Sequence, residues 1–161
     1  MSSRLVSIAI LFLTTLSGIT ACGRKPSATI QPAVNSGTSF TVQGEYELHY
    51  NAVRSDQLSA DIARNYGVTR SKNRVLLNIS VLHKTDAGKA VDADVTANSR
   101  NLAGQGQGIS LRRIGEGNAI YYLGEVVFSG TQTLIFDIAA TPAGSTIPIK
   151  ASLTREFSTE F

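Results

Sequence analysis

The sequence has few of the side chains that most often carry catalysis or bind metal ions. It contains no tryptophan, one cysteine and two histidines, and its one methionine is Met1. A single cysteine forms no intramolecular disulfide, and two histidines without methionine partners exclude a methionine–histidine copper carrier. No HExxH or CxxC spacing occurs, so we expect no metal and no cofactor. Because a nucleophile needs an activating base, and His49 and His83 fall at outward positions of expected strands, we expect no catalytic residue and no enzyme activity.

The charge balance gives no sign of a polyanionic partner. Fifteen Lys and Arg residues against twelve Asp and Glu residues leave a net charge of +3. Binding to duplexes needs cations clustered on one face, so we expect no nucleic-acid partner. The glycine-rich run 104–108 has the composition of a phosphate loop, but the residues after it, 109–114, alternate as a strand rather than a helix. We therefore predict a bulge or a tight crossing between strands there.

The N-terminal segment has the pattern of a lipoprotein leader. Arg4 precedes an apolar stretch, residues 5–16, that is too short to span a bilayer stably. The run Ile-Thr-Ala-Cys at 19–22 then forms a lipobox, which resembles the leaders of bacterial lipoproteins, in which the cysteine is acylated and the preceding peptide is removed. We expect residues 1–21 to be a signal peptide and Cys22 to be lipidated as the first residue of the mature chain.

Residues 22–39 read as the lipidated cysteine followed by a flexible tether. They are rich in small and polar side chains and hold too little apolar mass to form a core. Such a tether reaches about 20–25 Å, and two or more acyl chains would anchor it stably to a membrane. Gly23 stands where an aspartate would resemble an inner-membrane retention signal of enteric bacteria. We therefore expect the chain on the periplasmic face of the outer membrane rather than the inner one.

Residues 40–161 read as one domain whose dominant sequence period is two. Tyr46, Leu48 and Tyr50, for example, alternate with polar side chains, which is typical of a strand with one buried face. Similar segments separated by Gly, Asn and Asp turns recur along the domain. The sequence predicts a mainly β protein, an antiparallel immunoglobulin-like two-sheet sandwich of about seven strands with one short helix. The expected strands cover residues 45–51, 75–82, 91–98, 109–114, 119–128, 133–140 and 147–154.

The expected helix lies between residues 55 and 67. Leu58, Ile62 and Tyr66 recur at fourfold spacing, Ser59 is suited to cap the N-terminus, and Gly67 can supply the left-handed stop. This segment would cross between the first two predicted strands.

The most unusual polar stretch follows this helix, at residues 69–74. Its three cations stand among small hydroxyl and amide side chains, which could receive a carboxylate, a phosphate or a glycan. The alternative is that the cations cap carbonyl groups and pair with Glu45, Glu47 or Glu116. His49 and Asn51 share one face of their strand and could join a polar pocket with this loop. The residues of the predicted polar site are His49, Asn51, Arg70, Lys72, Asn73 and Arg74.

Several blocks of the domain resemble a known family. The sequences GEYELHYNA at 44–52, YGVTRSKNR at 66–74 and LNISV at 77–81 resemble blocks of the bacterial domain-of-unknown-function 4426 (DUF4426) family, as do residues 101–105 and EGNAIYY at 116–122. The resemblance implies a small secreted β-sandwich of Gram-negative bacteria without an assigned activity, so it supplies no catalytic residues. Members of that family resemble soluble periplasmic proteins with a plain signal peptide, and Cys22 departs from that pattern.

We therefore expect a non-enzymatic binding or accessory module of the cell envelope, anchored to a membrane through lipid and facing an envelope protein or glycan. The alternative is a small-ligand binder or hydrolase that uses a polar pocket around residues 70–74 and His49. A third hypothesis is an inhibitor or assembly factor that docks through an edge strand.

Overall fold

The chain folds into two antiparallel β-sheets that face each other and one short helical segment. The computed structural model describes residues 38–86 and 88–160. The predicted signal peptide, the lipidation site at Cys22 and nearly all of the predicted tether lie outside the described residues. None of the described helices is long and apolar enough to cross a membrane.

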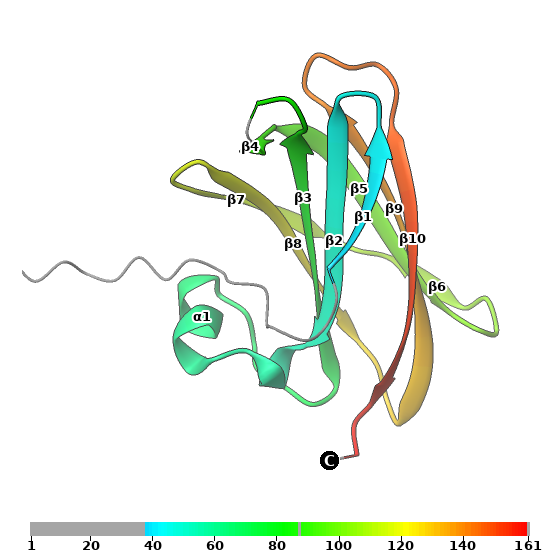
Figure 1. Ribbon diagram of the computed structural model, residues 1–161. Coiled ribbons are helices and arrows are strands. Elements are labelled where there is room, and N and C mark those ends of the chain that lie inside the picture. The colour runs from blue at the N-terminus through cyan, green and yellow to red at the C-terminus, as the bar shows by residue number, and fades with distance from the viewer. Residues whose placement is uncertain (1–37, 87, 161) are drawn as a thin grey trace, which may run out of the picture.

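The larger sheet has six strands and the smaller sheet has four (Figure 1). The six-stranded sheet contains β1 (Ser39–Gln43), β2 (Tyr46–Arg54), β3 (Arg74–His83), β4 (Lys89–Ala90), β7 (Leu111–Glu116) and β8 (Ala119–Val127). Its order is β1-β2-β3-β8-β7, and β4 also pairs with β3. The four-stranded sheet contains β5 (Ala93–Asn101), β6 (Gly106–Gly108), β9 (Thr131–Pro142) and β10 (Ile149–Ser158), in the order β10-β9-β5-β6. Between β2 and β3 lie the 3-10 turn η1 (Ser55–Gln57) and helix α1 (Ala60–Asn65).

This architecture confirms the predicted fold class, a mainly β protein built as a two-sheet sandwich. Each of the seven predicted strands corresponds to one of the longer strands of the structure. The short strands β1, β4 and β6 were not predicted, and β1 begins at the last residue of the predicted tether. The glycine-rich run, where a bulge or a tight crossing between strands was predicted, instead completes the β5–β6 turn and forms β6, and the chain crosses to the six-stranded sheet after it.

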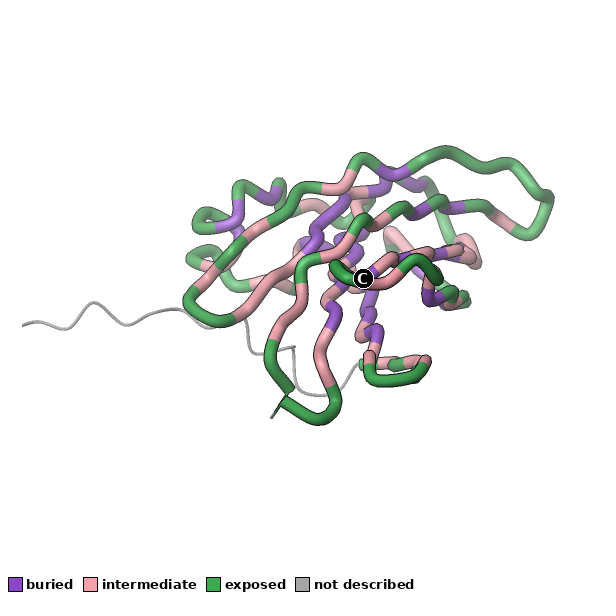
Figure 2. Tube along the Cα trace, turned by 90° about the horizontal axis from the view of Figure 1, so that it is seen from above, coloured by how far each residue is buried: buried purple, intermediate pink, exposed green. Residues whose placement is uncertain are grey.

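The main core fills the space between the two sheets (Figure 2). Alternate residues of β2 and β3 point into it, and Leu48, Leu77 and Ile79 are fully buried. Phe136 on β9 is also fully buried and lies edge-on to Phe157 of β10. Because truncating such a ring to alanine typically costs about 3–5 kcal/mol, these contacts hold the sheets together.

A second apolar cluster lies on the outer face of the six-stranded sheet, beneath α1. Ser59 caps the helix by accepting a hydrogen bond from the Ile62 amide at 3.2 Å, and Gly67 ends this segment with a φ of +60°. Both features confirm the predicted helix boundaries. The helix thus covers one half of the outer face and leaves the other half open. The buried members of the cluster are Ala63, Tyr66, Val68, Leu76 and Leu123.

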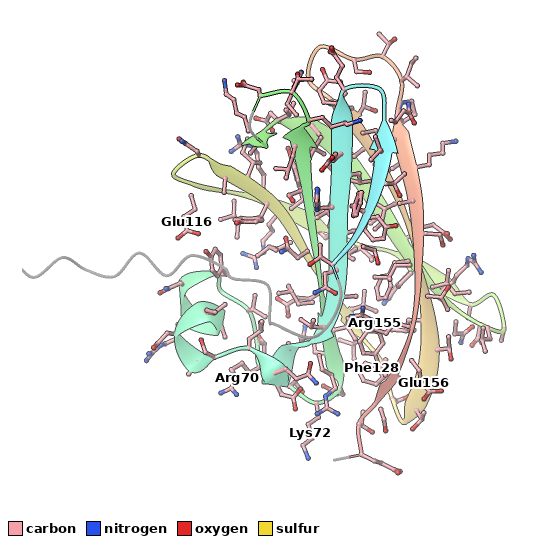
Figure 3. All side chains as sticks on the ribbon, in the orientation of Figure 1. Arg70, Lys72, Glu116, Phe128, Arg155 and Glu156 are labelled. Atoms are coloured by element: carbon pink, nitrogen blue, oxygen red, sulfur yellow. The ribbon has the colours of Figure 1, made fainter. Side chains whose placement is uncertain are left out.

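The half of β2 that β1 does not pair is joined to β10 by arginine side chains. Arg155 of β10 donates hydrogen bonds to the Ala52 carbonyl and, at 3.0 Å, to Asn51 Oδ1. Arg54 donates to the Ser158 carbonyl at 2.6 Å, and Figure 3 shows Arg155 lying between the two strands. These bonds satisfy polar groups at a sheet edge that would otherwise be unpaired.

A polar clasp connects the six-stranded sheet to the start of β5. Arg113 of β7 binds Asp92 in a bidentate manner, with Nη2 at 2.8 Å and Nε at 2.9 Å from the carboxylate oxygens. The Tyr122 hydroxyl donates to Asp92 Oδ1 at 2.6 Å and accepts from the Ala93 amide at 2.7 Å. The hydrogen bonds from Arg113 and Tyr122 lower the pKa of Asp92 from 3.8 to about 2.

The clasp predicts a specific acid sensitivity. Because the folded state depresses the pKa of Asp92, the carboxylate stabilises the fold above its ordinary pKa of 3.8, and this stabilisation is lost as pH falls towards about 2. We expect Asp92→Asn to be less stable than the wild type at neutral pH and to lose less stability between about pH 5 and 2. Denaturant unfolding followed by circular dichroism across this range measures the difference. Asp94→Asn, on the same strand segment, is the control, and parallel curves for Asp92→Asn and the wild type would refute the role of the clasp.

Candidate functional site

The open half of the outer face contains a pocket. It forms where the strand that pairs with one side of β3 changes from β8 to β4. Strand β8 pairs with β3 up to the Tyr122–Ile79 pair and then continues beside β7 alone. Strand β4 pairs with β3 only from Leu82 onward. Between these two pairings Ser80, an outward residue of β3, lacks a paired neighbour on one side, and a pocket of about 210 Å³ opens there. We call it the outer-face pocket, and its described lining residues are Thr38, His49, Tyr50, Asn51, Asn78, Ser80, Leu82, Ala90, Ala119, Ile120 and Tyr121.

Asn78 brings a buried atom without a hydrogen-bond partner to the lining of this pocket. Its Oδ1 atom is buried, and within the described residues it has no hydrogen-bond partner. The cross-strand neighbours of Asn78 are Asn51 on β2 and Leu123 on β8, so it stands at the border between the helix-covered half and the open half. A buried polar atom without a partner costs about 1–3 kcal/mol, which makes this position energetically unusual.

His49 and Asn51 both line the pocket, but neither faces water freely as the strand pattern suggested. His49 Nε2 lies 3.0 Å from Glu47 Oε2, and its ring stacks on Phe40 with centroids 5.5 Å apart. Phe40 on β1 is not a lining residue, and it remains 59% exposed. Asn51 is buried, and its Oδ1 accepts the hydrogen bond from Arg155.

The loop before β3 is held together by hydrogen bonds within the protein. Ser55, which is fully buried, donates to the Thr69 and Ser71 carbonyls and accepts from the Ser71 amide. Arg70 donates to the Asp56 carbonyl at 2.8 Å. Of the three cations that the alternative expected to cap carbonyl groups, Arg70 does so in this loop.

The remaining members of the predicted polar site differ from one another. Asn73 Oδ1 accepts a hydrogen bond from the Ser71 hydroxyl, whereas Lys72 is exposed and makes no ion pair with a described residue. Arg74 opens β3 and places Nη1 3.3 Å from Glu125 Oε2, although Arg74 Nε and that oxygen have no hydrogen-bond partner among residues 38–86 and 88–160. Arg74 therefore pairs with Glu125, and not with Glu45, Glu47 or Glu116 as the alternative proposed.

The structure does not bring these residues together into one pocket. His49 pairs with Ser80, which stands six positions, or about 20 Å, along β3 from Arg74. Leu76 and the helix packed on it occupy the outer face between these two points. Figure 3 shows Arg70 and Lys72 at the end of the molecule near η1, pointing outward. The single polar pocket predicted from the sequence is thus divided into an outer-face pocket and a structural loop.

Tyr121 joins the pocket to the helix-covered cluster. It lines the pocket and also packs against the apolar cluster beneath α1. Burial, together with the negative charge of Glu116, raises the pKa of Tyr121, so its hydroxyl stays protonated at neutral pH. Glu116 in turn accepts a hydrogen bond from the Tyr66 hydroxyl, whose pKa is raised by burial and by this bond. The pocket therefore has neutral polar groups on an apolar wall.

No group of three or more His, Cys, Asp or Glu side chains in the described part of the chain is arranged to hold a metal ion. His49, the histidine of the pocket lining, is paired with Glu47.

A two-sheet sandwich with a neutral pocket on its outer face defines the class of this protein as a small β-sandwich domain. A profile described as "Domain of unknown function (DUF4426)" matches residues 40–160, and the chain belongs to this family. A crystal structure of a DUF4426 family protein from Pseudomonas aeruginosa shares 30% sequence identity, with a TM-score of 0.65 over 76% of this chain and 95% of that one.

Two further similar structures are of FetP from uropathogenic Escherichia coli, at 12% identity. FetP as isolated after expression in the E. coli periplasm has a TM-score of 0.54, over 75% of this chain and 93% of its own. A copper-bound variant of FetP has a TM-score of 0.52, over 74% and 94%. At this identity the likeness concerns the fold alone. No match is found among curated proteins.

The unpaired Asn78 amide predicts an unusual stability effect. Replacing it with leucine removes the uncompensated buried oxygen and adds apolar surface of similar size, so we expect Asn78→Leu to raise the free energy of unfolding by about 1–2 kcal/mol. Urea unfolding at neutral pH measures this change. Asn98→Leu, at an exposed position of β5, is the matched control and should change stability by no more than about 0.5 kcal/mol. A clearly less stable Asn78→Leu protein would show that the amide is a structural group.

Proposed function

We propose that this protein is a non-enzymatic binding module of the cell envelope, held at the periplasmic face of the outer membrane by lipid on Cys22. Its binding surface is the outer-face pocket. The observation that carries this proposal is the buried Asn78 Oδ1, which lacks a hydrogen-bond partner within the described chain although its side chain lines the pocket on a central strand of the sheet. A bound ligand that turned the terminal amide of Asn78 towards the pocket and hydrogen-bonded to this atom would offset its desolvation cost.

The arrangement of possible nucleophiles and bases among the described lining residues favours binding over catalysis. The hydroxyl groups of Ser80 and Thr38 are nucleophile types that line the pocket, and His49, a possible base, is bonded to Glu47 on its own strand. No hydrogen bond links His49 to either hydroxyl group in the described structure. The proposal therefore sets the hydrolase alternative aside in favour of reversible recognition.

Two observations support the proposed compartment. The leader of residues 1–21 ends in a lipobox, and FetP, which shares the fold, was expressed in a periplasm. We do not extend copper binding from the FetP variant to this protein, because the described residues here offer no clustered ligand set.

A ligand panel tests the pocket as the binding surface. We expect at least one class among soluble peptidoglycan fragments, lipopolysaccharide core sugars and short peptides to raise the melting temperature of the full chain by a few degrees. The shift should disappear in Asn78→Ala and persist in Asn98→Ala. Differential scanning calorimetry measures it. A ligand whose effect survives Asn78→Ala, or a panel without any stabilising member, would argue against this pocket as the functional site.

The anchor is tested separately. Replacing residues 1–22 with the signal peptide of a soluble periplasmic protein should move the chain from the membrane fraction to the soluble periplasmic fraction, because the acyl chains that hold it are lost. Cell fractionation with immunoblotting measures the redistribution, and mass spectrometry of the unaltered protein should find an acylated N-terminal Cys22. An unmodified Cys22 would contradict the anchor but leave the ligand test unaffected.

A further inference from the structure

We propose that the outer-face pocket recognises an N-acetylated sugar, with the acetamido group inserted against Asn78. This inference rests on the proposed function and specifies its ligand. Four properties of the pocket support this ligand: its size, its lack of charge, its hydrogen-bonding groups and its apolar walls.

The pocket fits one ring-sized group. Its volume of about 210 Å³ corresponds to the space of about seven water molecules, which is below the range of sites that enclose drug-sized ligands. It opens on the face of the sheet and not along an edge, so a peptide cannot enter it by adding a strand to β1 or β7. A compact ligand read by side chains suits this position better than an extended chain.

The pocket suits an uncharged ligand. None of the described lining residues is Lys, Arg, Asp or Glu. His49 is the lining residue that can become cationic, and it faces Glu47 on its own strand at 3.0 Å. A phosphate, carboxylate or ammonium group placed here would lose water without gaining an opposite charge, which is strongly unfavourable. The requirement for an uncharged ligand distinguishes an N-acetyl sugar, which is neutral, from the corresponding amino sugar, which is cationic.

The polar groups of the pocket match an acetamido group on a hydroxylated ring. The buried Asn78 Oδ1 requires an N–H or O–H donor, and the described residues supply none. The hydroxyl groups of Ser80, Thr38 and Tyr121 line the same pocket and can both donate and accept, as sugar hydroxyls do. Because the Asn78 oxygen has almost no exposed surface in the ligand-free chain, its amide would turn about the soft terminal torsion to meet the acetamido N–H, while the ring hydroxyls would meet these side chains.

The apolar walls match the rest of the sugar. Leu82, Ala90 and Ala119 are small or aliphatic side chains that suit an acetyl methyl group. The Phe40 ring, stacked on the lining residue His49 and largely exposed, offers a flat surface beside that residue for the C–H face of a sugar ring. An exposed aromatic ring leaves apolar surface in water, which is unfavourable unless a ligand covers it.

The test is isothermal titration of the full chain, held in a detergent that has no sugar headgroup. The probes are N-acetylglucosamine, its β-1,4 dimer, glucose, glucosamine and N-acetyl-alanine methylamide. We expect binding of both N-acetylated sugars, at least about fivefold weaker binding of glucose, and none of the cationic glucosamine. Asn78→Ala should weaken N-acetylglucosamine about tenfold, since it removes one buried hydrogen bond, and Asn98→Ala should leave affinity unchanged. Ala119→Leu, which fills the pocket without altering Asn78, should also abolish binding.

Thermal melts of each variant confirm that it is folded before affinity is compared. Equal affinity of Asn78→Ala and the wild type for N-acetylglucosamine, or no heat from either N-acetylated sugar, would overturn the sugar assignment. Binding of the methylamide peptide that depends on Asn78 would also overturn it, while leaving the proposed binding function intact. If neither these probes nor the wider ligand panel gave a response that depends on Asn78, both the sugar assignment and the proposed binding function would be refuted.

Discussion

The hydrogen bonds between Asp92, Tyr122 and Arg113 fix the geometry on which the rest of the outer face depends. Asp92 stands two residues after β4, and Tyr122 is the first residue of β8 along the chain that pairs with β3. Because the carboxylate binds the Tyr122 hydroxyl and the Arg113 guanidinium together, it places the end of β4 beside the point where β8 leaves β3. The gap between these two neighbours of β3 is the outer-face pocket. A clasp with a role in joining the sheets thereby also shapes the site.

Much of the fold could be predicted from local patterns, and the parts that could not have physical explanations. Long strands with a period of two and the Ser59 cap are local features, so the sequence alone located them. Strands β4 and β6 have only two and three residues, too few to show a period. In β1 the apolar side chains Phe40 and Val42 are exposed and the intervening Thr41 is half-buried, so its alternation is reversed. Its pairing with β2, and not its own composition, makes it a strand.

The candidate site shows the same division between local and long-range information. The concentration of cations in residues 69–74 was visible, but their partners were not, because Asp56 and Glu125 approach from η1 and β8. His49 and Asn51 were correctly placed on one face, yet how far that face is covered depends on Phe40 and on Arg155 from the other sheet. Asn78 was not singled out at all. The feature of the sequence that could have marked Asn78 was an amide side chain at an outward position of the most apolar strand.

Asn51 and Asn78 show why that amide matters. They are the same residue type, on the same outer face, and directly opposite each other on β2 and β3. Asn51 is buried and its oxygen is satisfied by Arg155, which also binds the free edge of β2, so the architecture explains its presence. Asn78 has a buried oxygen that no described residue satisfies, and an aliphatic side chain there would continue the apolar surface of Leu76 and Leu123. A buried polar atom that weakens the fold, on a side chain that lines a pocket, is the feature that the proposed ligand would account for.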